Sequence, residues 1–146
     1  MNSPRDFEIL AVTIQLEGRP DIPVPLPPAD TPEDDWSPPA PLVLKEGADF
    51  RVRLEFRVRS PEDLVGLKFV DERHRRGVPV AHQEIHLGDY RPGGPYEVVL
   101  PSERLPMGHV ARDVYDATGT FLDGEGRVLG QERHSFEITK EWPHPH

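Results

Sequence analysis

The chain has no cysteine and only three lysines among its 146 residues. The absence of cysteine excludes disulfide bonds, thiolate nucleophiles and thiolate metal ligands, and it fits a reducing compartment. The sequence also lacks any run near the roughly 18 consecutive apolar residues that a membrane-spanning helix needs. Residues 1–6 lack the basic start and apolar core of a secretory signal. We therefore expect a cytoplasmic protein with no integral membrane association.

Basic residues are fewer than acidic ones, and the formal net charge is −9. Nucleic-acid binding depends on clustered lysine and arginine, so this balance argues against a nucleic-acid partner and favours a partner with a basic surface. Arginine carries most of the positive charge, and proline occurs 18 times. Together with abundant alanine, glycine and valine, this composition indicates the codon bias of a GC-rich bacterial genome.

The sequence shows no arrangement typical of a nucleophile or a cofactor site. It has no G-x-S-x-G turn, and Gly93-Gly94 is too short to cradle a phosphate. His82, Glu84 and His86 alternate, so on a strand they would share one face and could chelate a divalent ion. A solvated polar face is the preferred interpretation, because the H-E-x-x-H spacing has meaning only on a helix. We predict no catalytic residue, no metal and no cofactor.

Four carboxylates, Asp113, Asp116, Asp123 and Glu125, are expected to cluster near one turn. A hydrolase with paired carboxylates would need one of them desolvated, and their neighbours here are polar. A solvated rim is the simpler interpretation, and a docking edge for a basic partner is the alternative. Asp123 and Glu125 are the residues that we expect to contact such a partner.

Period-two alternation is the strongest structural signal in the chain. From Phe50 to Arg59 every even residue is apolar and every odd residue is charged. This pattern fits a strand with one face on a core and the other in water. Weaker alternation predicts further strands in six segments, residues 10–16, 65–70, 78–87, 96–100, 110–122 and 136–142.

About seven short strands, separated by glycine and proline, predict an all-β fold: an immunoglobulin-like β-sandwich of two antiparallel sheets. One domain over residues 1–146 is expected, with residues 143–146 as a frayed tail. We expect Tyr115 to close a corner of the sandwich with its hydroxyl. Trp142 is expected to pack at one end of it.

Residues 19–41 contain nine prolines. So much proline fits neither a helix nor an inner strand, and we expect an extended connection laid over the sandwich, held by Trp36. A surface connection without function is the simpler interpretation. A docking loop with Glu33-Asp34-Asp35 as its acidic tip is the alternative.

Short motifs in one order and spacing resemble the Rho GDP-dissociation inhibitors. Residues 42–58 are similar to the family's "VLKEG" turn followed by an aromatic residue, alternating basic and apolar residues and "FRV". The remaining motifs follow in register: Val65-Gly66-Leu67-Lys68-Phe69 is similar to "SGMKY", Arg75-Arg76-Gly77-Val78 to "RKGV", Leu87-Gly88-Asp89-Tyr90-Arg91-Pro92 to "VGSYGP", Pro95-Tyr96-Glu97 to the start of "YEF.TP", and residues 106–115 to "APKGMLARGSY". Phe121-Leu122-Asp123 falls on the family's acidic turn, and residues 138–142 fall on its last strand. The resemblance covers residues 7–142.

The resemblance implies an immunoglobulin-like sandwich whose two sheets take the geranylgeranyl tail of a Rho-type GTPase between them. It places six residues on the lining of this slot: Phe56, Val70, Val110, Ala117, Phe136 and Ile138. The family's N-terminal regulatory arm is expected to be missing, because the first strand begins near Phe7. His82, Gln83 and Glu84 also lie in a segment that departs from the family's "VDKTDYM".

The expected function is therefore a binding module without catalysis. We expect it to hold a free isoprenoid or lipid chain, or a lipidated small GTPase, between its sheets. The alternative is a lipid-free interaction domain with a fully packed core, which binds a protein through the proline-rich segment or the acidic rim. An open apolar space of about 300 Å³ or more between the sheets would favour the first function, and native packing density would favour the second.

Overall fold

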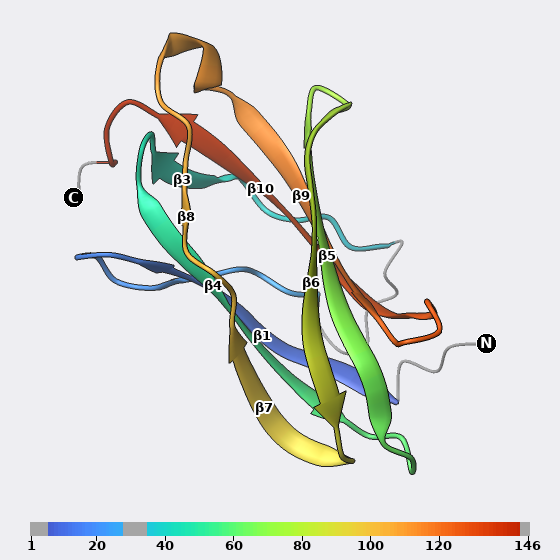
Figure 1. Cartoon of the computed structure of the whole chain (residues 1–146). Helices are drawn as coiled ribbons and strands as arrows, with labels where there is room; N and C mark the ends of the chain where they lie inside the picture. Colours follow the sequence, from blue (N-terminus) through green and yellow to red (C-terminus); the bar gives the residue numbers. More distant parts are fainter. Residues whose placement is uncertain (1–5, 28–34, 144–146) are drawn as a thin grey trace.

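The computed structural model describes residues 6–27 and 35–143, and its strands form two sheets that pack face to face (Figure 1). In sheet A, β1 lies between β2 and β4, β7 follows on the other side of β4, and β8 pairs with the start of β4. All these pairs are antiparallel. The strands of sheet A are β1 (Phe7–Leu16), β2 (Ile22–Pro23), β4 (Asp49–Val58), β7 (Gly93–Val99) and β8 (Glu103–Arg104).

Sheet B has the order β3-β10-β9-β5-β6. Its strands are β3 (Leu42–Lys45), β5 (Leu64–Arg75), β6 (Val78–Tyr90), β9 (Val114–Leu122) and β10 (Val128–Thr139). The expected all-β sandwich of immunoglobulin type is confirmed, with one correction. β3 pairs with β10 in parallel, because the proline-rich segment carries the chain from sheet A across to the far edge of sheet B.

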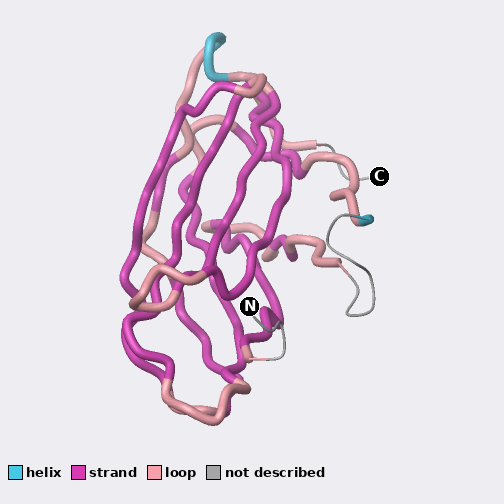
Figure 2. The backbone as a smooth tube through the Cα atoms, turned by 90° about the vertical axis from the view of Figure 1, so that its right-hand side faces the viewer, coloured by secondary structure: helices cyan, strands magenta, loops and turns pink. Residues whose placement is uncertain are grey.

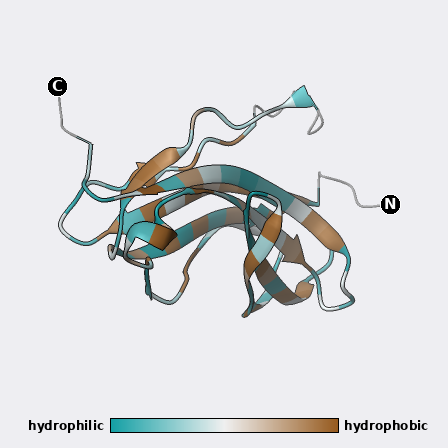
Figure 3. Ribbon diagram, turned by 90° about the horizontal axis from the view of Figure 1, so that it is seen from above, coloured by the Kyte–Doolittle hydropathy of each residue, from teal (hydrophilic) through white to brown (hydrophobic). Residues whose placement is uncertain are grey.

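Alternation positions the core between the sheets. In β4 the side chains of Phe50, Leu54, Phe56 and Val58 are buried, whereas the charged residues between them are exposed or half-buried. Viewed from above, apolar and polar residues alternate along the curved strands (Figure 3). Burial of an apolar side chain stabilises the fold by about 1.5–3 kcal/mol, so this register is strongly fixed.

One end of the interior is filled by aromatic rings. The ring of Phe56, which is fully buried, lies 5.2 Å from Phe7, 5.0 Å from Tyr90 and 6.2 Å from Phe121, measured between ring centroids. Tyr96 of β7 is 5.8 Å away on the edge of the same group. These rings come from both sheets, and their packing closes this end of the sandwich.

The predicted tyrosine corner is confirmed. The buried hydroxyl of Tyr115 donates a hydrogen bond to the Ala111 carbonyl oxygen over 2.6 Å. Ala111 ends η2 (His109–Ala111), a short 3₁₀ turn at one end of the sandwich (Figure 2). The strand predicted from residue 110 therefore begins four residues later, at Val114, because the corner bond and the 3₁₀ turn occupy residues 109–115.

The proline-rich segment is partly ordered by pairing and packing. Ile22 and Pro23 form a short strand against β1, so part of the expected extended connection pairs with sheet A. The backbone carbonyl of Trp36 accepts a hydrogen bond from Arg133 over 3.4 Å. Residues 28–34, which include Glu33 and Asp34 of the expected acidic tip, lie outside the described residues.

Candidate functional site: a cavity between the sheets

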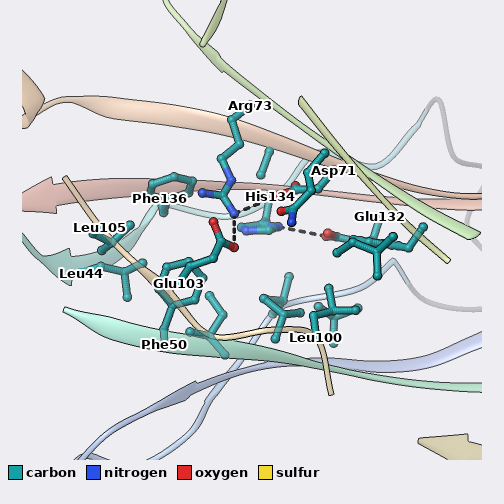
Figure 4. Close-up of a pocket in the computed structure, with 18 of the residues that line it drawn as sticks. Leu44, Phe50, Asp71, Arg73, Leu100, Glu103, Leu105, Glu132, His134 and Phe136 are labelled. Atoms are coloured by element: carbon teal, nitrogen blue, oxygen red, sulfur yellow. Dashed lines mark hydrogen bonds and ion pairs between the residues drawn. The ribbon is translucent and has the colours of Figure 1, made fainter. Parts of the chain in front are cut away.

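An inter-sheet cavity opens beside the aromatic end of the core (Figure 4). The cavity volume, meaning the space that a water-sized group can occupy, is about 40 Å³. The total space without protein atoms in this region is about 620 Å³, but this larger figure includes open solvent. Its apolar wall comes from both sheets and comprises Val12, Ile14, Val24, Leu44, Phe50, Val52, Phe69, Ile85, Leu100, Pro101, Leu105, Ala117 and Phe136. A cavity of this size holds a few water-sized groups. It is well below the about 300 Å³ that would by itself favour capture of an apolar chain over a fully packed interaction domain.

Sheet B places charged side chains on the same wall. Along β5, Asp71 and Arg73 share the inward face with Phe69, since residues two apart on a strand point the same way. On β10, Glu132 and His134 face inward in the same register as Phe136. The central strand β9 has only Gly119 and Ala117 at the corresponding positions. Their small size leaves a depression on the inner face of sheet B between the polar side chains of β5 and those of β10.

Arg73 joins the two sheets across the cavity. Its Nη2 atom lies 2.9 Å from Asp71 Oδ2 on its own strand and 2.8 Å from Glu103 Oε2 on β8 of sheet A. Burial raises the pKa of Asp71, and the nearby carboxylates of Glu103 and Glu132 raise it further, whereas Arg73 lowers it; the pKa as a whole lies above the ordinary value. Burial is thus the main cause of the raised pKa of Asp71, and the Arg73 guanidinium offsets part of its effect.

Glu132 and His134 form the other polar pair of the wall. Their atoms Oε2 and Nδ1 are 3.0 Å apart, and Glu132 is only 4% exposed. Of the described titratable groups on the wall, Arg73 is the only one that carries a permanent positive charge. The wall thus combines an apolar surface with three carboxylates, of which two pair with the Arg73 guanidinium and the third, Glu132, pairs with His134.

The structure separates the six predicted lining residues. Ala117 and Phe136 border the cavity. Ile138 is buried further along the same face of β10, and Phe56 lies in the closed aromatic end. The other two residues do not face the cavity: Val70 points to the outer face of sheet B, because its neighbour Phe69 faces inward, and Val110 is 76% exposed in η2.

A second concavity, the end groove, lies at the aromatic end of the sandwich, where Phe7 belongs to both, and has a volume of about 620 Å³. Its charged lining is mainly acidic, with Asp6, Glu62, Asp63, Asp123 and Glu125 against one arginine, Arg127. Apolar residues complete it: Phe7, Val58, Leu64, Val65 and Leu129.

The two residues predicted to contact a basic partner have different environments in this groove. Asp123 is 6% exposed, and its Oδ1 atom accepts hydrogen bonds of 2.9 Å from the backbone N–H groups of Glu125 and Arg127. Burial alone would raise the pKa of Asp123, but these bonds and the Arg127 guanidinium lower it below the ordinary value. Asp123 therefore holds the turn together, and Glu125 is the exposed residue of the two.

The predicted cluster of four carboxylates is not formed. Asp113 precedes β9 and Asp123 follows it, so nine strand residues separate them. Asp113 instead pairs with Arg75 over 2.7 Å, and this hydrogen bond lowers the pKa of Asp113. The prediction that these carboxylates cluster near one turn is therefore wrong, because Asp113 and Asp123 lie at opposite ends of β9.

The remaining polar candidates stay apart. His82, Glu84 and His86 lie exposed on β6, where His82 is 3.7 Å from Glu72 and Glu84 is 3.3 Å from Lys68. Within residues 6–27 and 35–143 no group of three or more His, Asp or Glu residues is arranged to hold a metal ion. The same part of the chain has no helix with the length and apolar character to cross a bilayer.

Sequence reasoning missed the charged residues of the cavity wall. Asp71 and Arg73 continue the inward register of Leu67 and Phe69, and Glu132 and His134 precede Phe136 in the same register. This period of two was the available signal. It did not identify these residues, because the strands predicted over residues 65–70 and 136–142 were shorter than β5 and β10 and left all four outside.

Comparison with known proteins matches residues 1–141 to a family described as "RHO protein GDP dissociation inhibitor". A Rho GDP-dissociation inhibitor 1 of Arabidopsis thaliana is 32% identical over 139 residues, which are 94% of this chain and 55% of that protein. A Rho GDP-dissociation inhibitor of Schizosaccharomyces pombe is 30% identical, covering 97% of this chain and 68% of the relative. The human Rho GDP-dissociation inhibitor 1 is 32% identical, covering 69% and 50% respectively.

These relatives come from a plant, a yeast and a mammal, and they do not support the bacterial source expected from composition. The chain spans about half the length of several of the curated relatives it matches. Among solved structures, a Bacteroides fragilis chain described as a beta-galactosidase aligns with a TM-score of 0.53 at 13% identity, over 93% of this chain and 16% of that one. This last likeness concerns the fold alone.

Proposed function

Because this chain belongs to the family of Rho GDP-dissociation inhibitors, we propose that it binds a lipidated Rho-type GTPase and takes the lipid chain between its two sheets. The observation that carries the proposal is the inter-sheet cavity, whose wall is apolar on both sheets and includes Ala117 and Phe136. The role is one of binding rather than of catalysis.

The energetics of chain capture favour this role. Each buried methylene contributes about 0.8 kcal/mol, so an isoprenoid chain gains on the order of 10 kcal/mol before costs. A bilayer offers the same chain a similar gain, so a carrier needs a further contact with the protein that bears the lipid. We expect that contact to come from the surface of the GTPase itself.

Capture requires the sheets to separate, since the cavity volume is only about 40 Å³. Around the cavity the sheets meet through side chains, and the ion pair of Arg73 with Glu103 crosses from one to the other. The apolar side chains that meet between the sheets can contact a hydrocarbon chain instead of each other. Their apolar surface then stays out of water when the sheets separate. The narrow cavity is thus the place at which the sandwich opens.

The test is a titration of the chain with a fluorescent peptide that carries a geranylgeranylated cysteine. Ala117→Leu fills the cavity and should weaken binding at least tenfold, while Val110→Leu, on the exposed 3₁₀ turn, should leave it unchanged. Circular dichroism checks that both variants are folded. Absence of binding by the unaltered protein, or equal loss in the two variants, would refute capture in the cavity.

The end groove favours a second candidate function, the docking of a basic protein segment without a lipid. Five carboxylates against one arginine, with apolar residues between them, suit a peptide that alternates lysine or arginine with apolar residues. Reversing charge with Glu62→Lys should weaken such binding and reduce its dependence on salt. Binding of the lipidated peptide would be unaffected.

A further inference from the structure

The charged part of the cavity wall has a defined construction on sheet B. Across β5, β9 and β10, Asp71 pairs in register with Gly119 and Gly119 with Glu132. A Cβ atom at Gly119 would overlap the ring of Phe69 and come within 3.0 Å of Glu132 Oε1. The missing side chain is therefore what allows the Glu132 carboxylate and the Phe69 ring to lie over the central strand.

The next register row repeats the pattern, with Arg73 opposite Ala117 and Ala117 opposite His134. We call this depression the trough: its floor is the small residues of β9, and its sides are the polar residues of β5 and β10 in the same two rows. Glu103 of β8 faces it from the other sheet. In Figure 4 the side chains of Arg73, Glu103 and His134 converge on this space.

The trough has an excess of negative charge. Among the described residues of the trough, Asp71, Glu103 and Glu132 supply three carboxylates and Arg73 supplies one permanent cation, so carboxylates are in excess. The guanidinium is already divided between two carboxylates, and only the imidazole accompanies Glu132. Burial next to hydrocarbon makes unbalanced carboxylates costly, and a cation of the ligand would offset that cost.

A purely hydrocarbon ligand would leave the excess of carboxylates over cations in the trough unchanged, and an anionic head group would add to the repulsion. A primary ammonium is compact and donates three hydrogen bonds, and its size suits a cavity of about 40 Å³. The apolar wall next to the trough would contact the carbon chain that bears it. A guanidinium is larger and planar, and a quaternary ammonium has no N–H donor.

We propose that the inter-sheet cavity binds amphiphiles with a primary ammonium head, which lies in the trough between Glu132 and Asp71 while its apolar chain follows the wall of the cavity. The inference rests on the proposed function, because the chain enters by the same separation of the sheets. In addition, the cavity would discriminate between amphiphiles by the charge of their head group.

Isothermal titration calorimetry of the full chain with decylamine, decanol and decanoate tests this at concentrations below micelle formation. Decylamine should bind about tenfold more tightly than decanol, as expected for a charge-assisted hydrogen bond, and decanoate should bind most weakly. Glu132→Gln should remove the preference for the amine and leave decanol binding unchanged. Glu72→Gln serves as the control, because Glu72 is exposed on the outer face of β5, next to Asp71.

The outcomes separate this inference from the proposed function. Equal affinity for amine and alcohol, or an equal effect of Glu132→Gln and Glu72→Gln, would overturn the ammonium site while capture of the chain stands. Failure of all three probes to bind would overturn both. If Glu132→Gln unfolds, Asp71→Asn provides the same comparison with the same control.

Discussion

Gly119 is the residue on whose size the shape of the cavity wall depends most. A Cβ atom there would meet the Phe69 ring and Glu132, so Gly119→Ala is expected to destabilise the fold by about 1–3 kcal/mol through overpacking. At Gly130 the nearest atom to an added Cβ is the flexible end of Ile9 at 3.2 Å, and Gly130→Ala should change the free energy of unfolding much less. Urea denaturation of both variants measures the difference, and equal values would contradict this account of the wall.

Asp123 is expected to stabilise its turn in a pH-dependent way. Asp123→Asn should cost about 1–3 kcal/mol at pH 7, because the charged acceptor of two backbone N–H groups is lost. The folded pKa is lowered, so this contribution is present above the ordinary aspartate pKa of about 3.9 and is lost as the pH falls through the lower folded value.

The stability difference between Asp123→Asn and the unaltered protein should therefore shrink in acid, as measured by thermal unfolding between pH 7 and pH 2. Glu125→Gln is the matched control, because the Glu125 carboxylate is exposed and only approaches Arg127 at 4.0 Å. A difference that stayed constant down to the lowest pH would show that the charge of Asp123 has no part in the turn.

At the residue scale, burial was predictable from alternation and the location of the cavity was not. Phe56, Ala117, Phe136 and Ile138 are all buried as expected. Which of these buried side chains borders the cavity depends on the side chains of the opposite sheet. The alternation pattern of a single strand contains no information about them. Val70 is buried as well, but the family resemblance placed it on the lining, whereas alternation along β5 gives the inward face to its neighbour Phe69.

At the scale of elements, the corner between η2 and β9 depends on one hydroxyl. Tyr115→Phe should destabilise the fold by about 1–2 kcal/mol, since it leaves the buried Ala111 carbonyl without its donor. Tyr96→Phe is the control, because the Tyr96 hydroxyl bonds to Arg91 at an exposed position, and it should cost less than about 0.5 kcal/mol. Chemical denaturation distinguishes the two, and an equal effect would argue against the corner as a specific support.

The long strands could be predicted from the sequence, and their partners could not. The alternation of residues 50–59 is unambiguous, and the structure places β4 at Asp49–Val58. The short strands β3 and β8 carry too few residues to show a period of two. β3 forms because its backbone groups bond to β10, and β8 forms because its backbone groups bond to β4. These pairings depend on residues far away in the sequence, so the short segments alone do not predict them.

At the scale of the whole molecule, the two sheets are tightly packed at their aromatic end and less tightly packed around the cavity. The rings around Phe56 fix one end of the sandwich. The cavity has side-chain contacts and one ion pair between the sheets, from Arg73 to Glu103. A hydrocarbon chain would therefore separate the sheets at the cavity and leave the aromatic end closed.

Methyl NMR spectra of the full chain, recorded while a geranylgeranylated peptide is added, test this claim most directly. If the chain is captured in the cavity, the methyl signals of Leu44, Leu100 and Ala117 on its wall should show saturable shifts, and those of Val65 and Leu129 in the end groove should stay unchanged. Shifts confined to Val65 and Leu129, or no shifts at all, would contradict it.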